Sequence, residues 1–167
     1  MSRPAVNIVG VGNILMGDDG VGPAVIEALR RRGVPRGVEL YDAGLAASDV
    51  LGGLDPEAPL VVVDSLRADG EPGSVFQAPL SAICDEEGTL AGGVSLHELN
   101  VLRVLRMEAL TGREFRDVTV FGVEPGRLAW GEGLSEPVRE AVGKLVERLL
   151  EYVGERYACE AVGDEKP

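Results

Sequence analysis

The stretch "NIVGVGNILMGDDGVG", residues 7–22, joins an apolar run to a glycine-rich turn and then to the start of a helix. Residues 5–11 are rich in β-branched side chains, which indicates a buried strand. The apolar positions that follow have helical spacing: Val21, Val25, Ile26 and Leu29. This helix should stop near Gly33 and Pro35. A strand, a glycine turn and a helix in this order are typical of α/β proteins.

The rest of the chain continues this alternation of strands and helices. Further strands are expected at residues 38–42, 60–66, 74–77 and 117–123. A helix should begin at the capping box of Ser95 and Glu98, and the last helix should begin near Ser135. The sequence therefore predicts an α/β fold, a three-layer α/β/α sandwich with a mostly parallel central sheet of about five strands. Residues 1–154 should form a single domain, and residues 155–167 a flexible C-terminal tail.

Composition excludes several classes of function. The 167-residue chain has 28 acidic and 16 basic residues and a formal charge of -12, so we expect no nucleic-acid partner. No apolar run approaches the ~20 residues that a membrane span needs, and the first residues lack the pattern of a signal peptide. We therefore expect a cytoplasmic protein without membrane insertion. Cys84 and Cys159 have no C-x-x-C spacing, which argues against a zinc site.

Acidic side chains follow the predicted strands at the points where these strands end. Asp18 and Asp19 follow the first strand, Asp42 ends the second and Asp64 ends the third. Because ligands of parallel α/β sheets bind at the carboxyl ends of the strands, these acids should share one edge of the sheet. His97, the only histidine, lies at the start of a predicted helix and could join them.

The opening stretch also resembles a dinucleotide-binding loop, because three glycines, Gly10, Gly12 and Gly17, follow a strand. However, Asp18 and Asp19 would stand where a pyrophosphate needs donors. At ~4 Å and an effective dielectric near 20, each carboxylate would repel a unit negative charge by about 4 kcal/mol. A helix N-terminus offsets up to ~2 kcal/mol. The aspartates therefore favour a loop that presents oxygen ligands to a cation.

Simpler interpretations of the same residues stay open at this point. Asp18 on its own is equally well explained as a cap of the following helix, and Asp42 and Asp64 as solvated strand ends. A nucleophile paired with His97 is a further alternative. Its candidates are Ser95, Ser65 and Cys84, but none of them lies in a nucleophile elbow.

Four segments, "GVGNILMGDDGVG", "VVVDS", "SLHELN" and "GVEPGRLAWGEGLS", resemble the hydrogenase maturation proteases in order along almost the whole chain. These endopeptidases remove a C-terminal extension from the large subunit of nickel-iron hydrogenases. The resemblance implies that Asp19, Asp64 and His97 bind a metal and take part in catalysis. Some members carry a glutamate at the position of Asp19. The resemblance also implies that the substrate contacts three further residues, Asp42, Gly12 and Asn13.

The resemblance further implies that nickel is not a permanent cofactor but belongs to the substrate, the hydrogenase large-subunit precursor. Two carboxylates and one imidazole leave coordination positions open, which the precursor can fill. Cleavage could use metal polarisation of the scissile carbonyl or a water activated by a carboxylate. The alternative function is a non-hydrolytic nucleotide- or metal-binding regulatory domain. A different peptidase on the same scaffold, such as the spore germination endopeptidase, is a third possibility.

Overall fold

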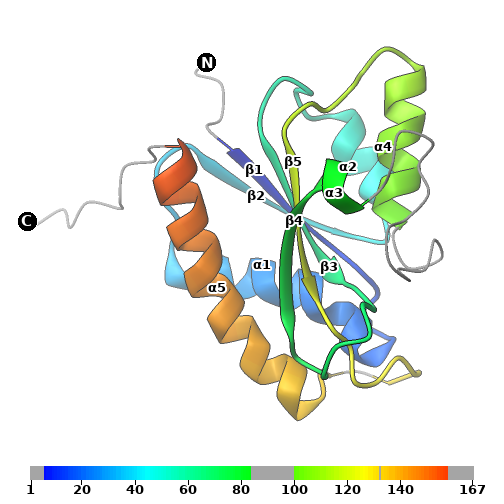
Figure 1. Ribbon diagram of the computed structural model, residues 1–167, viewed down its shortest axis with the longest axis vertical. Helices are drawn as coiled ribbons and strands as arrows, with labels where there is room; N and C mark the ends of the chain where they lie inside the picture. Colours follow the sequence, from blue (N-terminus) through cyan, green and yellow to red (C-terminus); the bar gives the residue numbers. More distant parts are fainter. Residues whose placement is uncertain (1–5, 84–99, 132, 158–167) are drawn as a thin grey trace, which may run out of the picture.

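The computed structural model describes residues 6–83, 100–131 and 133–157. Its five-stranded sheet has the order β2-β1-β3-β5-β4 (Figure 1). The strands are β1 (Val6–Val11), β2 (Val38–Gly44), β3 (Leu60–Ser65), β4 (Val75–Pro79) and β5 (Val118–Val123). β1, β2, β3 and β5 run parallel, and β4 pairs antiparallel with β5 at one edge. The predicted mostly parallel sheet of about five strands is confirmed.

Helices cover both faces of this sheet. They are α1 (Val21–Arg32), α2 (Ala47–Gly52), α3 (Leu80–Ile83), α4 (Asn100–Leu110) and α5 (Glu136–Tyr157), with a 3-10 turn, η1 (Gly17–Gly20), before α1. α1 packs against α5 on one face, and α2 packs against α4 on the other (Figure 1). The chain is therefore the three-layer α/β/α sandwich that its sequence predicts. None of the described helices is long and apolar enough to span a membrane.

The core consists of two apolar layers separated by the sheet. On β1, Val9 faces the layer formed with α2 and α4, whereas Ile8 faces the layer formed with α1 and α5. Val62 and Val61 alternate in the same way on β3. Every residue of β1, β3 and β5 is buried. Strands buried on both faces have continuous apolar sequences, which is why the three central strands could be predicted.

Several elements differ from the sequence-based expectation. The sequence analysis did not predict α2, α3 or η1. β4 covers residues 75–79 where residues 74–77 were expected, and β2 continues past Asp42 to Gly44. α5 continues past residue 154 to Tyr157, while the division into a domain and a tail stays a prediction. The capping box of Ser95 and Glu98 lies outside the described residues.

Candidate functional site

Asp19 and Asp64 meet at the carboxyl edge of the sheet through Ser65. The Ser65 hydroxyl donates a hydrogen bond to Asp19 Oδ1 at 2.9 Å, and the Ser65 N–H donates to Asp64 Oδ1 at 2.8 Å. Asp64 is buried and Asp19 is half-buried. The predicted third member, His97, lies outside the described residues, and within those residues no trio of metal-binding side chains is close enough to hold an ion. The structure therefore brings together two of the three predicted ligands.

The turn after β1 fixes the orientation of Asp19. The Asn13 N–H donates to Asp19 Oδ2 at 2.8 Å, while Asn13 Oδ1 accepts from the Leu15 N–H at 3.0 Å and closes a tight turn. Gly12 has a φ of 131°, and a Cβ at Gly12 would lie 1.9 Å from the carbonyl oxygen of Asp19. Gly12 and Asn13 therefore have a structural role in holding Asp19. Their contact with substrate stays a prediction.

Asp42 lies at the same edge, on β2. It pairs in register with Gly10 of β1, and its side chain is exposed. Together with Ile14 and Leu134 it lines a hollow of about 350 Å³ that lies beside η1 and the start of α1. The placement at the carboxyl edge agrees with the sequence, and the predicted contact between Asp42 and substrate stays a prediction. Ser95 and Cys84, the other predicted nucleophiles besides Ser65, lie outside the described residues.

Asp18 does not cap a helix, in contrast to the simpler interpretation of the sequence. Neither η1 nor α1 has a side-chain hydrogen bond at its N-cap. The Asp18 carboxylate is fully buried and accepts four hydrogen bonds from the segment between β5 and α5, residues 124–135, which we call the β5–α5 loop. The donors are the Gly126 N–H at 2.8 Å, the Arg127 N–H at 2.7 Å and, both at 2.7 Å, the N–H and hydroxyl of Ser135. One aspartate of the pair therefore lies beside Ser65 at the carboxyl edge of the sheet, and the other anchors a loop.

The hydrogen bonds of Asp18 also determine its ionisation. Burial by itself raises the pKa, but the hydrogen bonds from Ser135, Arg127 and Gly126 outweigh it and hold the pKa of Asp18 below its ordinary value. A carboxyl whose pKa is lowered in the folded state stabilises the fold above its unfolded pKa, and this contribution is lost as the pH falls through the folded pKa. Acid should therefore weaken the attachment of the β5–α5 loop.

Asp18→Ala should lower the free energy of unfolding by at least ~2 kcal/mol, because it leaves buried donors without an acceptor. In urea titrations from pH 7 down to about pH 3, the wild-type protein should lose stability more steeply than Asp18→Asn, which has no charge to titrate. An exposed acid of the same type, Asp49 on α2, provides the control. If Asp18→Ala and Asp49→Ala unfold at the same urea concentration, the anchoring role of Asp18 is wrong.

Gly17, which precedes the acidic pair, is also under strict conformational constraint. It has a φ of 58°, and a Cβ there would lie 2.7 Å from the carbonyl oxygen of Arg127. Gly17→Val should therefore cost about 1–3 kcal/mol of stability in urea denaturation, because it displaces Asp19 and the β5–α5 loop together. Gly143→Ala is the control, since that α5 position has open space around it and should gain up to ~1 kcal/mol. A Gly17→Val protein as stable as the wild type would contradict a constrained turn.

Glu124 is a buried acid at this edge that the sequence analysis missed. It directly follows β5, and its Oε2 accepts a hydrogen bond from the Ala68 N–H at 2.7 Å. Its carbonyl oxygen accepts another from the Gly73 N–H at 2.8 Å. Glu124 thus holds the loop after β3 against the end of β5. The segment that contains it was noted in the sequence, but nothing local distinguishes a buried glutamate from an exposed one.

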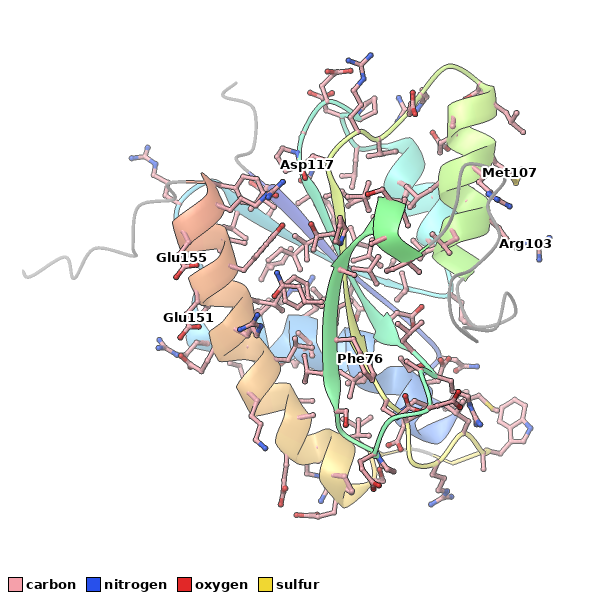
Figure 2. The ribbon with its side chains drawn as sticks, in the orientation of Figure 1. Phe76, Arg103, Met107, Asp117, Glu151 and Glu155 are labelled. Carbon is pink, nitrogen blue, oxygen red and sulfur yellow. The ribbon has the colours of Figure 1, made fainter. Side chains whose placement is uncertain are left out.

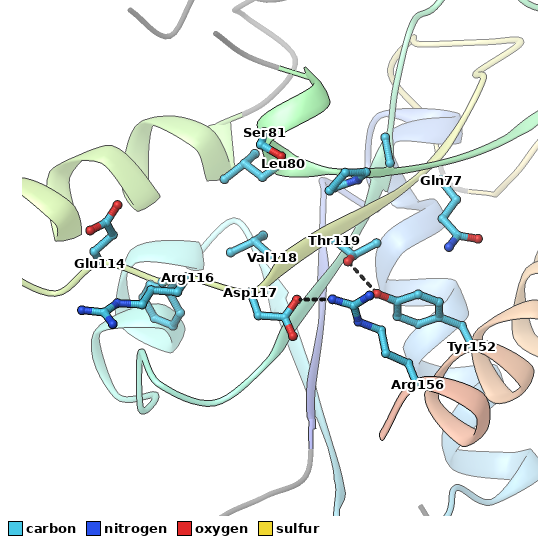
Figure 3. Close-up of a pocket in the computed structure, with 13 residues that line it drawn as sticks. Gln77, Leu80, Ser81, Glu114, Arg116, Asp117, Val118, Thr119, Tyr152 and Arg156 are labelled. Carbon is cyan, nitrogen blue, oxygen red and sulfur yellow. Dashed lines mark hydrogen bonds and ion pairs between the residues drawn. The ribbon is translucent and has the colours of Figure 1, made fainter. Parts of the chain in front are cut away.

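A larger hollow of about 1020 Å³ lies at the opposite end of the sheet, near the start of β5 (Figure 3). Several of its charged and polar groups bind one another: Arg156 pairs with Asp117 at 3.1 Å, and the hydroxyls of Tyr152 and Thr119 are 2.7 Å apart. In parallel α/β sheets, ligands bind at the carboxyl ends of the strands, and this hollow lies at the amino end of β5. We therefore place the functional site at Asp19 and Asp64 and not in this larger hollow.

Comparison with known proteins gives one consistent family. A family model described as hydrogenase maturation protease matches residues 23–152. The chain is 31% identical over 169 residues to the hydrogenase expression/formation protein HoxM of Azotobacter vinelandii, covering 98% of this chain and 79% of HoxM. It is 30% identical over 147 residues to the hydrogenase 2 maturation protease of Escherichia coli K12, covering 86% and 87% of the two chains.

Solved structures agree with this result. The hydrogenase maturating endopeptidase HybD from Escherichia coli superposes with a TM-score of 0.73 at 28% identity, covering 92% of this chain and 93% of HybD. The [NiFe] hydrogenase maturation protease HycI from Thermococcus kodakarensis superposes with a TM-score of 0.67 at 27% identity, covering 90% and 92%. The similarity therefore extends to the whole architecture.

Proposed function

Because the chain belongs to the hydrogenase maturation protease family and is a hydrolase, we propose that it removes the C-terminal extension of a nickel-iron hydrogenase large-subunit precursor after nickel insertion. One observation supports this most directly: Asp19 and Asp64 are joined through Ser65 at the carboxyl edge of the sheet. A pair of carboxylates at this edge, of which Asp19 is half-buried and Asp64 buried, is suited to hydrolysis of a peptide bond.

Nickel would enter this site with the precursor and not as a resident cofactor. The residues fit such a role, because Asp19 and Asp64 supply carboxylate oxygens, and the predicted third ligand, His97, would supply an imidazole nitrogen. Each Asp19 oxygen accepts one hydrogen bond, from the Asn13 N–H or the Ser65 hydroxyl, and retains a further lone pair. Nickel, when bound, would polarise the scissile carbonyl as a Lewis acid.

The carboxylates also support the second route to cleavage, in which one of them takes a proton from the attacking water. Asp19 is oriented for this by its two hydrogen bonds, which hold its carboxylate in a fixed plane. Asp64 is oriented by the Ser65 N–H. Both routes therefore depend on the same two side chains.

The experiment that tests the proposal is incubation of the purified protein with a purified, nickel-loaded hydrogenase large-subunit precursor from the same organism. Intact-mass spectrometry should show a shortened large subunit together with the released C-terminal peptide. The precursor incubated alone is the control. An unchanged precursor mass after prolonged incubation with the folded protein would overturn the proposal. Tight dinucleotide binding in the same preparation would favour a regulatory domain instead.

A further inference from the structure

Large apolar side chains are exposed in three places on the described part of the chain, one of which is the single residue Leu45, 71% exposed directly after β2. Ile14, Leu15 and Trp130 are 57%, 44% and 75% exposed, and all three lie in the turn after β1 or in the β5–α5 loop. Met107 and Leu110, at 67% and 88%, lie on α4. α4, with Met107 labelled, and the loop after β5 are at opposite ends of the molecule in Figure 2. The first group, Ile14, Leu15 and Trp130, is here called the apolar platform.

The two segments that carry the apolar platform are joined by backbone hydrogen bonds. The Gly131 N–H donates to the Leu15 carbonyl at 2.9 Å, and the Gly17 N–H donates to the Gly131 carbonyl at 3.0 Å. The buried carboxylate of Asp18 adds its hydrogen bonds to the same loop. These contacts hold the segments that carry Trp130 and Leu15 in fixed positions relative to each other. Exposed apolar groups on a rigid frame lose little conformational entropy when a partner covers them.

The turn that carries Ile14 and Leu15 also orients Asp19, the candidate catalytic acid. Asn13, which directly precedes Ile14, donates its N–H to Asp19 Oδ2 at 2.8 Å. Ile14 also forms part of the wall of the hollow of about 350 Å³ that Asp42 lines. The apolar platform is therefore continuous with the candidate site, and a chain bound on it would extend toward Asp19.

The chemistry of the platform indicates a protein partner. Small molecules bind in concave pockets that bury most of their surface, whereas Trp130 projects into solvent. Tryptophan and arginine, with tyrosine, are enriched among the residues that contribute most binding energy at protein interfaces. Arg127 fits this pattern, since it is exposed and one of its guanidinium nitrogens lies 3.1 Å from the position that a Gly131 Cβ would occupy. An apolar stretch of polypeptide, with backbone carbonyls available to Arg127, is complementary to this surface.

We propose that the apolar platform of Ile14, Leu15 and Trp130 is a docking surface that binds an apolar segment of the precursor polypeptide next to the bond to be cut. This inference rests on the proposed function. It assigns substrate affinity to the platform and the chemical step to Asp19 and Asp64. The platform should therefore affect KM and leave kcat nearly unchanged.

The test compares Trp130→Ala and Ile14→Ala with Leu110→Ala, a control residue on α4 that is 88% exposed. Each platform variant should raise KM for the nickel-loaded precursor about tenfold, with kcat within about twofold of wild type and an unchanged Tm. Trp130→Phe should recover most of the affinity, because it keeps an aromatic ring. Leu110→Ala should behave as wild type. An unchanged KM in Trp130→Ala, or an equal rise in Leu110→Ala, would overturn the inference.

A binding measurement separates failure of this inference from failure of the proposed function. The Asp64→Asn protein, with and without Trp130→Ala, is titrated with the same purified precursor in a calorimeter. If the wild-type protein does not cleave the precursor, and Trp130→Ala nevertheless weakens precursor binding about tenfold, the proposed function is wrong and the docking surface is supported. If the wild-type protein cleaves the precursor and Trp130→Ala binds the precursor with unchanged affinity, the docking surface is wrong. A dimer in sedimentation that Trp130→Ala dissociates would identify a second copy of this chain as the occupant and also overturn the inference.

Discussion

Asp64→Asn and Asp19→Asn should each reduce cleavage of the nickel-loaded precursor by about 10²–10⁴-fold, the range associated with loss of a positioned acid or base. Asparagine preserves the size of the side chain. In Asp64→Asn its oxygen can accept from the Ser65 N–H, and in Asp19→Asn its oxygen can accept from the Asn13 N–H while its NH2 donates to the Ser65 hydroxyl. The substitution therefore removes charge and basicity with little change in packing. Single-turnover cleavage measured by intact-mass spectrometry, together with Tm, would separate loss of chemistry from loss of structure.

Asp55→Asn provides a matched control for this experiment. Asp55 also accepts a hydrogen bond from a nearby backbone N–H, that of Glu57 at 2.9 Å, but it is exposed and precedes the start of β3 at the opposite end of the sheet. Its variant should cleave at the wild-type rate. Ser65→Ala should lie between the two, since it removes one of the two hydrogen bonds that orient Asp19. An Asp64→Asn protein with the wild-type rate and fold would exclude Asp64 from the reaction.

The second large effect concerns nickel. Asp19, Asp64 and His97 would offer at most three protein ligands, so the isolated protease should bind free nickel weakly. A precursor that already holds nickel would supply the remaining ligands, and the two proteins would share one ion. If the shared ion contributes about 3 kcal/mol, the protease should process loaded precursor roughly a hundredfold faster than empty precursor at subsaturating concentration. Initial cleavage rates of both precursor forms give this ratio directly.

Three mixtures decide the matter: protease with empty precursor, protease with nickel-loaded precursor, and nickel-soaked protease with empty precursor. Only the second should be cleaved efficiently. Asp49→Asn protease, altered on the outside of α2, should retain the same preference. Equal processing of empty precursor in the presence of a chelator would show that the acids at this edge do not sense nickel.

The parts of the fold that the sequence predicted are those whose local pattern has one explanation. β1, β3 and β5 are buried on both faces, so their sequences are apolar over their whole length. α1 ends at Arg32, directly before Gly33, as this glycine indicates. α2 was missed because six residues are too few to show a helical period, and the antiparallel pairing of β4 leaves no mark in its own sequence.

The site was predicted less completely, because long-range hydrogen bonds determine it. Asp18 and Asp19 are identical and adjacent, but neighbours in a 3-10 turn point in directions about 120° apart, so they have different surroundings. The partners of Asp18 are Ser135 and two backbone N–H groups of the β5–α5 loop, and no local pattern marks them. Ser65 was considered only as a nucleophile, whereas its hydroxyl supports Asp19.

The hydrogen bonds from Ser135 to Asp18 have a consequence for how the protease is made in the cell. They join residues separated by 117 positions, so a nascent chain cannot complete them until Ser135 has left the ribosome. Before that point, the turn that presents Asp19 lacks the loop that fixes it, although β1, α1 and β3 can already be folding. Peptidase activity should therefore appear late in translation, and chains that stall before Ser135 should be released as inactive fragments.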